Sequence, residues 1–252
     1  MKVMTWNIGS SPEARESLEV MLSEHEPHVI CLQHRTALNS LLVELLSEHG
    51  YELEYSTGAG GLLTMASRQP FSLVEGDVIP EFPQGAGIMS AVIAGIRLYN
   101  VLLPTVSHTT EPEFESKLKA CHKIGKLLGQ RHGEEDAFVL AGSMMIAPLP
   151  DDVWSVDTMK DQVSYHPLEH KEWAELLAQG LHDGVKPYLP SRTFTAWAPG
   201  GENGSESRGM RLDHFLVSGS MVERIGDGAV HSLPEGQGAH HAPVFMTLDL
   251  FY

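Results

Sequence analysis

Two short runs of uninterrupted apolar residues constrain the fold more than any other feature of the sequence. One is Val29-Ile30-Cys31-Leu32, and the other covers residues 137–141 (AFVLA). Runs of this length without alternation are typical of strands that are buried on both faces. A helix is predicted after the first run, over residues 37–49, and another before the second run, over residues 112–131. Strands that alternate with helices indicate an α/β protein, here as one domain over residues 1–252.

Glycine and proline residues separate the other predicted elements. Further strands are predicted over residues 2–8, 51–55, 62–67, 71–79, 89–94, 97–103, 212–217 and 244–250. Further helices are predicted over residues 11–26 and 168–179, and residues 199–207 (PGGENGSES) are predicted to form a loop. No repeat of solenoid period interrupts this order.

The charge and the cysteine content exclude several classes of protein. The formal net charge is −16, so a protein that coats nucleic acid without sequence preference is excluded, although a local basic cleft is not. Cys31 and Cys121 cannot form a disulfide framework. No apolar run is long enough to span a membrane, and the opening residues MKVMTWNIGS lack the apolar core of a signal peptide. A cytoplasmic location is therefore the expectation.

Six short sequence blocks lie at predicted strand ends. They are TWNI (5–8), VICLQ (29–33), NVLLP (100–104), AGSMMIAP (141–148), RGMRLDHFLVS (208–218) and HHAPV (240–244). In this order the blocks resemble the endonuclease/exonuclease/phosphatase superfamily, and most closely its exodeoxyribonuclease III and abasic-site endonuclease branch. The resemblance covers essentially the whole chain.

The resemblance implies a fold, a chemistry and a set of site residues. The fold would be the DNase I-like four-layer α/β sandwich, with two packed mixed β-sheets flanked by helices and an active site at the strand ends of one edge. The chemistry would be phosphodiester hydrolysis with Mg²⁺ or Mn²⁺ as cofactor and DNA as partner. Asn7, Asp213 and His241 match the family's catalytic positions.

Five other functional positions of the family carry different side chains here. The family has a metal-binding glutamate, a tyrosine, a water-positioning aspartate, an asparagine and an aspartate at these places. This chain has His34, Leu102, Ser143, Met145 and His240, in the same order. A serine hydroxyl does not ionise near neutral pH, methionine offers only a weak acceptor, and leucine cannot form a hydrogen bond. Magnesium selects oxygen ligands, whereas imidazole suits Zn²⁺, Ni²⁺ or Cu²⁺.

Three interpretations follow from these replacements. In the first, the chain is an exonuclease III-like pseudo-nuclease that does not hydrolyse its substrate and acts by binding nucleic acid or a protein partner. In the second, His34, Asp213, His240 and His241 form a rewired site for a Zn²⁺-like metal. In the third, the chain is an ordinary Mg²⁺-dependent phosphodiesterase or DNA nuclease that uses other carboxylates nearby, such as Asp136 or Asp151.

Two segments supply candidate contacts to nucleic acid. Residues 192–197 (RTFTAW) resemble the family's aromatic loop beside the DNA groove, where Phe194 and Trp197 would contact bases. Arg208 and Arg211 would meet phosphates. The competing interpretation places both aromatic rings in the core and Arg211 in a buried ion pair.

Overall fold

Two six-stranded β-sheets and a two-stranded ribbon form the centre of the protein. The computed structural model describes residues 1–9, 14–34, 40–56, 62–74, 87–197, 208–231 and 241–250, except for the side chains of His34 and Leu62. No described helix is long and apolar enough to cross a membrane.

The first sheet brings the two ends of the chain together. Its strand order is β13-β14-β1-β2-β4-β3. The bounds are β1 (Lys2–Asn7), β2 (Val29–His34), β3 (Glu52–Tyr55), β4 (Leu62–Ser67), β13 (Ile225–Val230) and β14 (Val244–Leu248). β1 pairs with β2 in parallel and with β14 in antiparallel orientation, so the first strand lies in the middle of the sheet.

The second sheet has the order β5-β6-β7-β8-β12-β9. Its strands are β5 (Phe71–Leu73), β6 (Gly87–Ile93), β7 (Ile96–Leu102), β8 (Phe138–Ser143), β9 (Leu181–Asp183) and β12 (Asp213–Ser218). β7 and β8 are parallel, and the other pairs are antiparallel. The separate ribbon consists of β10 (Ala196–Trp197) and β11 (Gly209–Met210).

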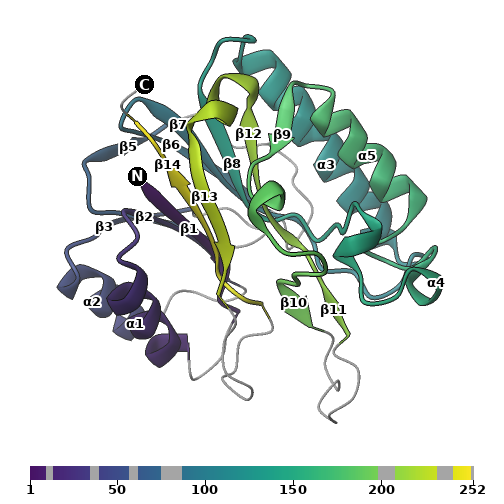
Figure 1. Ribbon diagram of the computed structural model, residues 1–252, viewed down its shortest axis with the longest axis horizontal. Helices are drawn as coiled ribbons and strands as arrows, with labels where there is room; N and C mark the ends of the chain where they lie inside the picture. The colour runs from purple at the N-terminus through teal and green to yellow at the C-terminus, as the bar shows by residue number, and fades with distance from the viewer. Residues whose placement is uncertain are drawn as a thin grey trace.

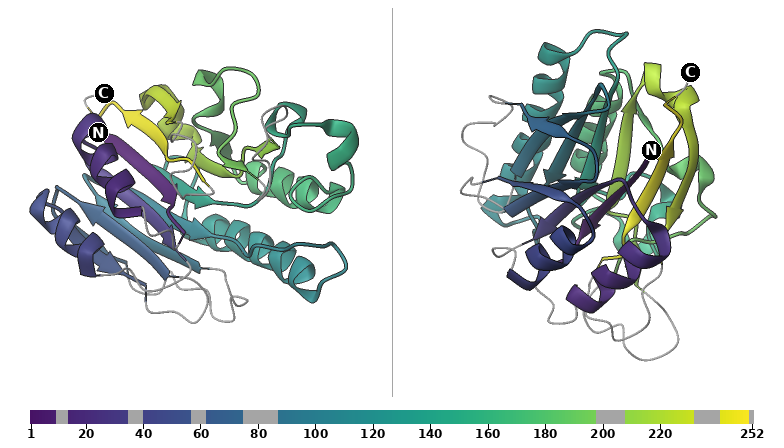
Figure 2. Two further views of the ribbon diagram at one scale, coloured as in Figure 1. Left: turned by 90° about the horizontal axis from the view of Figure 1, so that it is seen from below. Right: turned by 90° about the vertical axis from the view of Figure 1, so that its left-hand side faces the viewer.

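Helices cover the outer faces of both sheets, which gives four layers (Figures 1 and 2). α1 (Ala14–His25) and α2 (Ser40–Glu48) pack on the first sheet through an apolar cluster that includes Trp6 and Leu18. α3 (Pro112–Arg131) and α5 (Pro167–Leu177) cover the second sheet. The remaining helical turns are η1 (Pro150–Asp152), α4 (Val156–Met159), η2 (Lys186–Tyr188) and η3 (Gly219–Arg224). The four-layer sandwich expected from the sequence is confirmed.

The central core lies between the two sheets and is mainly aliphatic, with Val3, Val139 and Phe215 among its buried members. A polar link at Asn100 crosses it. Asn100 on β7 accepts a hydrogen bond from Gln33 and donates to the carbonyl oxygens of Leu32 (3.0 Å) and Thr64 (3.0 Å). Because a buried amide must satisfy its donors, this link favours a single relative position of the two sheets.

Most predicted elements agree with the structure within a few residues, but no strand was predicted at β9, β10, β11 or β13. β13, with the sequence IGDGAV, contains two glycines and an aspartate, which are poor strand formers, and it lies at the edge of its sheet. The strand predicted over residues 71–79 ends at Leu73, and the start of the helix predicted over 11–26 lies partly outside the described residues.

Candidate active-site cleft

The predicted sequence blocks meet at one edge of the two sheets. Asn7 ends β1 and is paired with Gln33 near the end of β2. Ser143 ends β8, where it is paired with Leu102 on one side and with Asp213 on the other. Parallel strands end at the same edge, whereas β12 runs antiparallel to β8, so its first residue lies beside the last residue of β8. The sheet registers therefore determine which side chains face one another.

Asp213 is the centre of a closed hydrogen-bond network. Its side chain is buried, with 1% of the residue exposed. The Ser143 hydroxyl donates to Oδ1, and the Asn7 amide donates to Ser143 Oγ at 3.1 Å. Oδ2 accepts from Thr195 Oγ1 at 2.6 Å and contacts Nδ1 of His241 at 2.7 Å. Both carboxylate oxygens are therefore engaged by protein groups.

Thr195 is a member of this network that sequence reasoning did not single out. Its Oγ1 donates to Asp213 and accepts from the backbone amides of Leu212 (2.9 Å) and Asp213 (3.1 Å). Its backbone carbonyl accepts from the amide of Ala242 at 2.7 Å. In the segment RTFTAW the aromatic residues carry the resemblance to the family, whereas a buried threonine between them gives no distinct sequence signal.

His241 is held in place from several sides. Trp6 Nε1 donates to its carbonyl oxygen at 2.9 Å, and an isolated β-bridge pairs it with Ala196. Its Nδ1 contacts Asp213, so Nε2 is the ring nitrogen left for a ligand. About 12% of the side chain is exposed.

The pKa of Asp213 reflects these contacts. Burial alone would raise the pKa, because it disfavours the charged carboxylate. The charge of His241 and hydrogen bonds from His241, Ser143 and Thr195 outweigh burial and hold the pKa of Asp213 below its usual value. Asp213 is therefore an ionised group that orients His241.

The loop after β8 has a backbone conformation that does not suit its sequence. Met145 adopts a left-handed conformation with φ of 55°, which asparagine and glycine tolerate better than methionine. The sequence resemblance places an asparagine at this position. Buried Lys117 donates to the Met145 carbonyl and pairs with Glu169, and His214 Nε2 lies 2.8 Å from the carbonyl of Ile146. These contacts hold the loop in its shape although the asparagine side chain is missing.

Arg211 does not have the exposure that a contact to nucleic acid requires. Only 1% of its side chain is exposed. Its guanidinium donates to both carboxylate oxygens of Asp152 at 2.8 and 3.0 Å, and lies 2.7 Å from Oδ2 of Asp183. The assignment of Arg211 to phosphate binding is therefore corrected. Two carboxylates already neutralise its charge, and the competing interpretation of a buried ion pair describes it.

Two exposed arginines lie around the β10–β11 ribbon. Arg208 lies over the ring of Trp154 at 5.4 Å, and Arg192 lies over the ring of Phe194 at 5.7 Å and donates to the Trp154 carbonyl. Phe194 and Trp197 are half-buried. This ribbon adjoins His241 through the bridge to Ala196, so it lies beside the Asp213 network.

The other predicted site residues lie in the core, outside the described residues or at the surface. Leu102 is buried in the core between the sheets, and Met145 is buried beside α3 and α5. Of the four proposed metal ligands, Asp213 and His241 are in direct contact, whereas His240 and the side chain of His34 lie outside the described residues. Asp136 and Asp151 are exposed. Asp136 accepts from the amide of Gly133, and Asp151 accepts from Ser191, so neither belongs to the Asp213 network.

Comparison with known proteins identifies the family. The family model described as Endonuclease/Exonuclease/phosphatase family matches residues 4–234. The chain belongs to this family. Exodeoxyribonuclease III of Haemophilus influenzae is 24% identical over 97% of this chain and 98% of its own length. The DNA-(apurinic or apyrimidinic site) endonuclease of Dictyostelium discoideum is 20% identical over 99% of this chain and 71% of its own length.

Solved structures of the family share the fold. An AP endonuclease from Archaeoglobus fulgidus superposes with a TM-score of 0.84 at 22% identity, covering 99% of both chains. The 3′ phosphatase NExo from Neisseria, bound to product DNA hairpin, superposes with a TM-score of 0.83 at 23% identity, again over 99% of both chains. At this identity the likeness establishes the four-layer architecture of the Endonuclease/Exonuclease/phosphatase family.

The described side chains of this cleft do not fit the magnesium ion that the family chemistry implies. Mg²⁺ requires hard oxygen ligands in near-octahedral geometry and is usually held by one or two carboxylates. Among the described residues, the network at the cleft contains one carboxylate, Asp213, and both of its oxygens accept hydrogen bonds from protein groups. Ser143 and Met145 stand where the resemblance places an aspartate and an asparagine.

Proposed function

We propose that this protein is an exonuclease III-like pseudo-nuclease that binds DNA in its cleft without hydrolysing it. The observation that carries the proposal is the closed network at Asp213. The Ser143 hydroxyl donates a hydrogen bond to this carboxylate. A hydrolytic mechanism needs a base that orients the attacking water, and the serine in this position cannot supply one near neutral pH.

The strained loop also supports the proposal. The left-handed conformation at Met145 costs free energy for a methionine, yet the backbone keeps it. This conformation suits the asparagine of the family pattern, whose amide would contact a phosphate. Retention of the loop without that side chain is what we expect of a scaffold whose hydrolytic function has been lost while its shape has been kept.

Binding would depend on a local group of residues, because the overall charge of the protein opposes DNA. His241, when protonated beside Asp213, would donate from Nε2 to a phosphate oxygen. Arg192 and Arg208 would contribute phosphate contacts at the ribbon, next to the half-buried rings of Phe194 and Trp197. Relatives of this chain carry names that state action on DNA, including the endonuclease for apurinic or apyrimidinic sites.

Fluorescence anisotropy with labelled DNA tests the binding. The probes are a duplex with an abasic-site analogue, an intact duplex and a single strand, each at low and at physiological ionic strength. We expect binding to at least one probe, and weaker binding with a smaller salt dependence for Arg192→Ala and Arg208→Ala. Lys126→Ala removes one positive charge from α3 and serves as the matched control. The absence of binding to every probe at low salt would overturn the proposal.

A cleavage assay tests the loss of hydrolysis. The same DNA molecules are incubated with Mg²⁺, Mn²⁺ or Zn²⁺, beside His241→Ala as a control for contaminating nucleases. We expect no cleavage above this control. Cleavage that His241→Ala abolishes would instead support an active phosphodiesterase, and the metal that sustains it would distinguish a magnesium enzyme from a histidine-bound transition-metal enzyme.

A further inference from the structure

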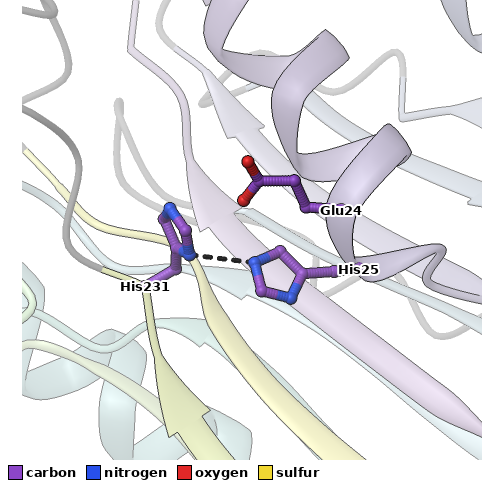
Figure 3. A group of neighbouring side chains, drawn as sticks. All are labelled: Glu24, His25 and His231. Carbon is purple, nitrogen blue, oxygen red and sulfur yellow. Dashed lines mark hydrogen bonds between the residues drawn. The ribbon is translucent and has the colours of Figure 1, made fainter.

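Two histidines and a glutamate form a compact group away from the cleft network. Glu24 and His25 lie at the C-terminal end of α1, and His231 directly follows β13. One potential ligand atom from each residue lies within 4.8 Å of the others. Figure 3 shows both imidazole rings and the carboxylate turned towards one common space. The three side chains come from segments that are about two hundred positions apart in the chain, so the fold itself assembles the group.

The two imidazole rings meet through their nitrogen atoms. His25 Nε2 and His231 Nδ1 are 2.8 Å apart, and the ring planes are inclined by 79°. Only one proton can lie between two such nitrogens, so at least one of them presents a lone pair to the other. A metal ion binds a neutral imidazole through a nitrogen lone pair of this kind.

The surroundings fix the position of His25. Its ring packs on Phe245 with ring centres 4.5 Å apart, and Lys2 Nζ donates to its carbonyl oxygen at 2.8 Å. A hollow of about 130 Å³ between α1 and the β13–β14 hairpin is lined by His25 and His231, and also by Lys2 and Asp227. The helix C-terminus carries a partial negative charge, which favours a cation, and the Glu24 carboxylate adds a full negative charge. The positive charge of Lys2, which also lines the hollow, opposes the binding of a cation there.

We propose that Glu24, His25 and His231 bind one divalent transition-metal ion, which clamps the end of α1 to the β13–β14 hairpin. Two imidazole nitrogens and a carboxylate oxygen are a ligand set that suits Zn²⁺, Ni²⁺ or Cu²⁺ and leaves a fourth position for water. The ion would replace the direct contact between the two rings. To bind it, the two ring nitrogens would have to move slightly apart. This proposal is independent of whether the cleft hydrolyses DNA.

The position of His231 connects this clamp to the cleft through the chain. His231 lies at the start of the connection from β13 to β14, and His241 lies at its end. The His231 amide donates to the carbonyl of Pro243 at 3.0 Å, so the two ends of the connection are already joined. A metal ion on His231 would hold one end of this connection against α1 while Asp213 holds His241 at the other end.

Metal titration of the full chain tests the proposal. The protein is stripped with a chelator, and Zn²⁺ is titrated in competition with a chromogenic chelator, while Co²⁺ absorption reports the coordination. We expect one equivalent of metal and a higher melting temperature in its presence. The variants His25→Gln and His231→Gln should weaken binding at least about tenfold. Glu24→Gln changes an exposed side chain, so it should weaken binding while the fold stays intact.

Three control variants assign the bound ion to a place in the molecule. His182→Gln changes an exposed histidine and should leave binding unchanged. Glu172→Gln changes a second group, in which Glu172 and Glu175 approach His122 within 3.6 and 3.4 Å, and it should also have no effect. His241→Gln should leave this site loaded. The proposal is overturned if the wild type binds no metal, if the three ligand variants bind as the wild type does, or if binding is lost in a control variant instead.

Discussion

Ser143 and Asp213 are direct partners across the β8–β12 ladder, and the Ser143 hydroxyl donates to Oδ1 of Asp213. Cross-strand neighbours on one face have Cβ atoms about 4.5–5.5 Å apart, so whatever residue stands at position 143 faces the Asp213 carboxylate. A serine makes this pair a satisfied hydrogen bond. An aspartate would make it a pair of carboxylates, which is stable when a cation lies between them.

The variant Ser143→Asp is therefore expected to be less stable than the wild type by roughly 1–3 kcal/mol at pH 8. Repulsion between the carboxylates raises the pKa of one of them above its unfolded value. The loss of stability is then small below that unfolded pKa and grows as the pH rises through the folded pKa. Urea unfolding at pH 4 and pH 8, with and without Mg²⁺, measures this. The same loss at both pH values would contradict it, and Ser143→Ala controls for the lost hydroxyl.

A comparison of two small residues isolates the backbone strain at Met145. Both Met145→Ala and Met145→Gly remove the buried side chain, so the loss of packing is nearly common to them. In an ordinary position alanine is the more stable of the two. Here the left-handed conformation reverses the order, and we expect the glycine variant to be more stable by about 1 kcal/mol. Chemical denaturation of both variants measures the difference. An alanine variant equal to or above the glycine variant would show that the strain is absent.

Arg208 and Arg211 are separated by two residues and are expected to behave in opposite ways. Arg211→Met leaves the buried Asp152 and the partly buried Asp183 without the guanidinium that they share and should cost about 3–5 kcal/mol of unfolding free energy. Arg208→Met should change stability by no more than about 0.5 kcal/mol, because its charge is exposed. The two melting curves, recorded beside DNA binding by each folded variant, separate a structural arginine from a ligand contact. Equal stability of the two variants would contradict a structural role for the ion pairs of Arg211 with Asp152 and Asp183.

Acid should destabilise the protein through its buried aspartates. The pKa values of Asp152 and Asp213 lie below their unfolded values, because the charges and hydrogen bonds of their partners outweigh burial. A carboxyl group of this kind stabilises the fold above its unfolded pKa, near 4, and loses that contribution as the pH falls through the folded pKa. Unfolding free energies between pH 7 and pH 2.5 should therefore fall steeply below about pH 4. Asp213→Asn should show a shallower fall, and an unchanged slope would exclude Asp213 as a contributor.

The sequence predicts the sheets and the cleft positions because both depend on local patterns. The buried runs at residues 29–32 and 137–141 predict one central strand in each sheet, β2 and β8, and the blocks at strand ends identify Asn7, Asp213 and Ser143. The partners of these residues depend on the tertiary structure. Arg211 lies in the same block as Asp213, and only the fold shows that Asp152 and Asp183 enclose it. Thr195 enters the network through the ribbon, and β13 forms because its neighbour β14 offers an edge.

The placement of β1 between β2 and β14 has a consequence for how the chain is made. β1 is synthesised long before its partner β14, which begins at Val244. During translation the β14-facing edge of β1 therefore remains unpaired until β14 has left the ribosome. Pairings between such distant segments form slowly, because a long loop must close before they contribute. A chain that stalls before residue 244 would present this edge as a template for aggregation.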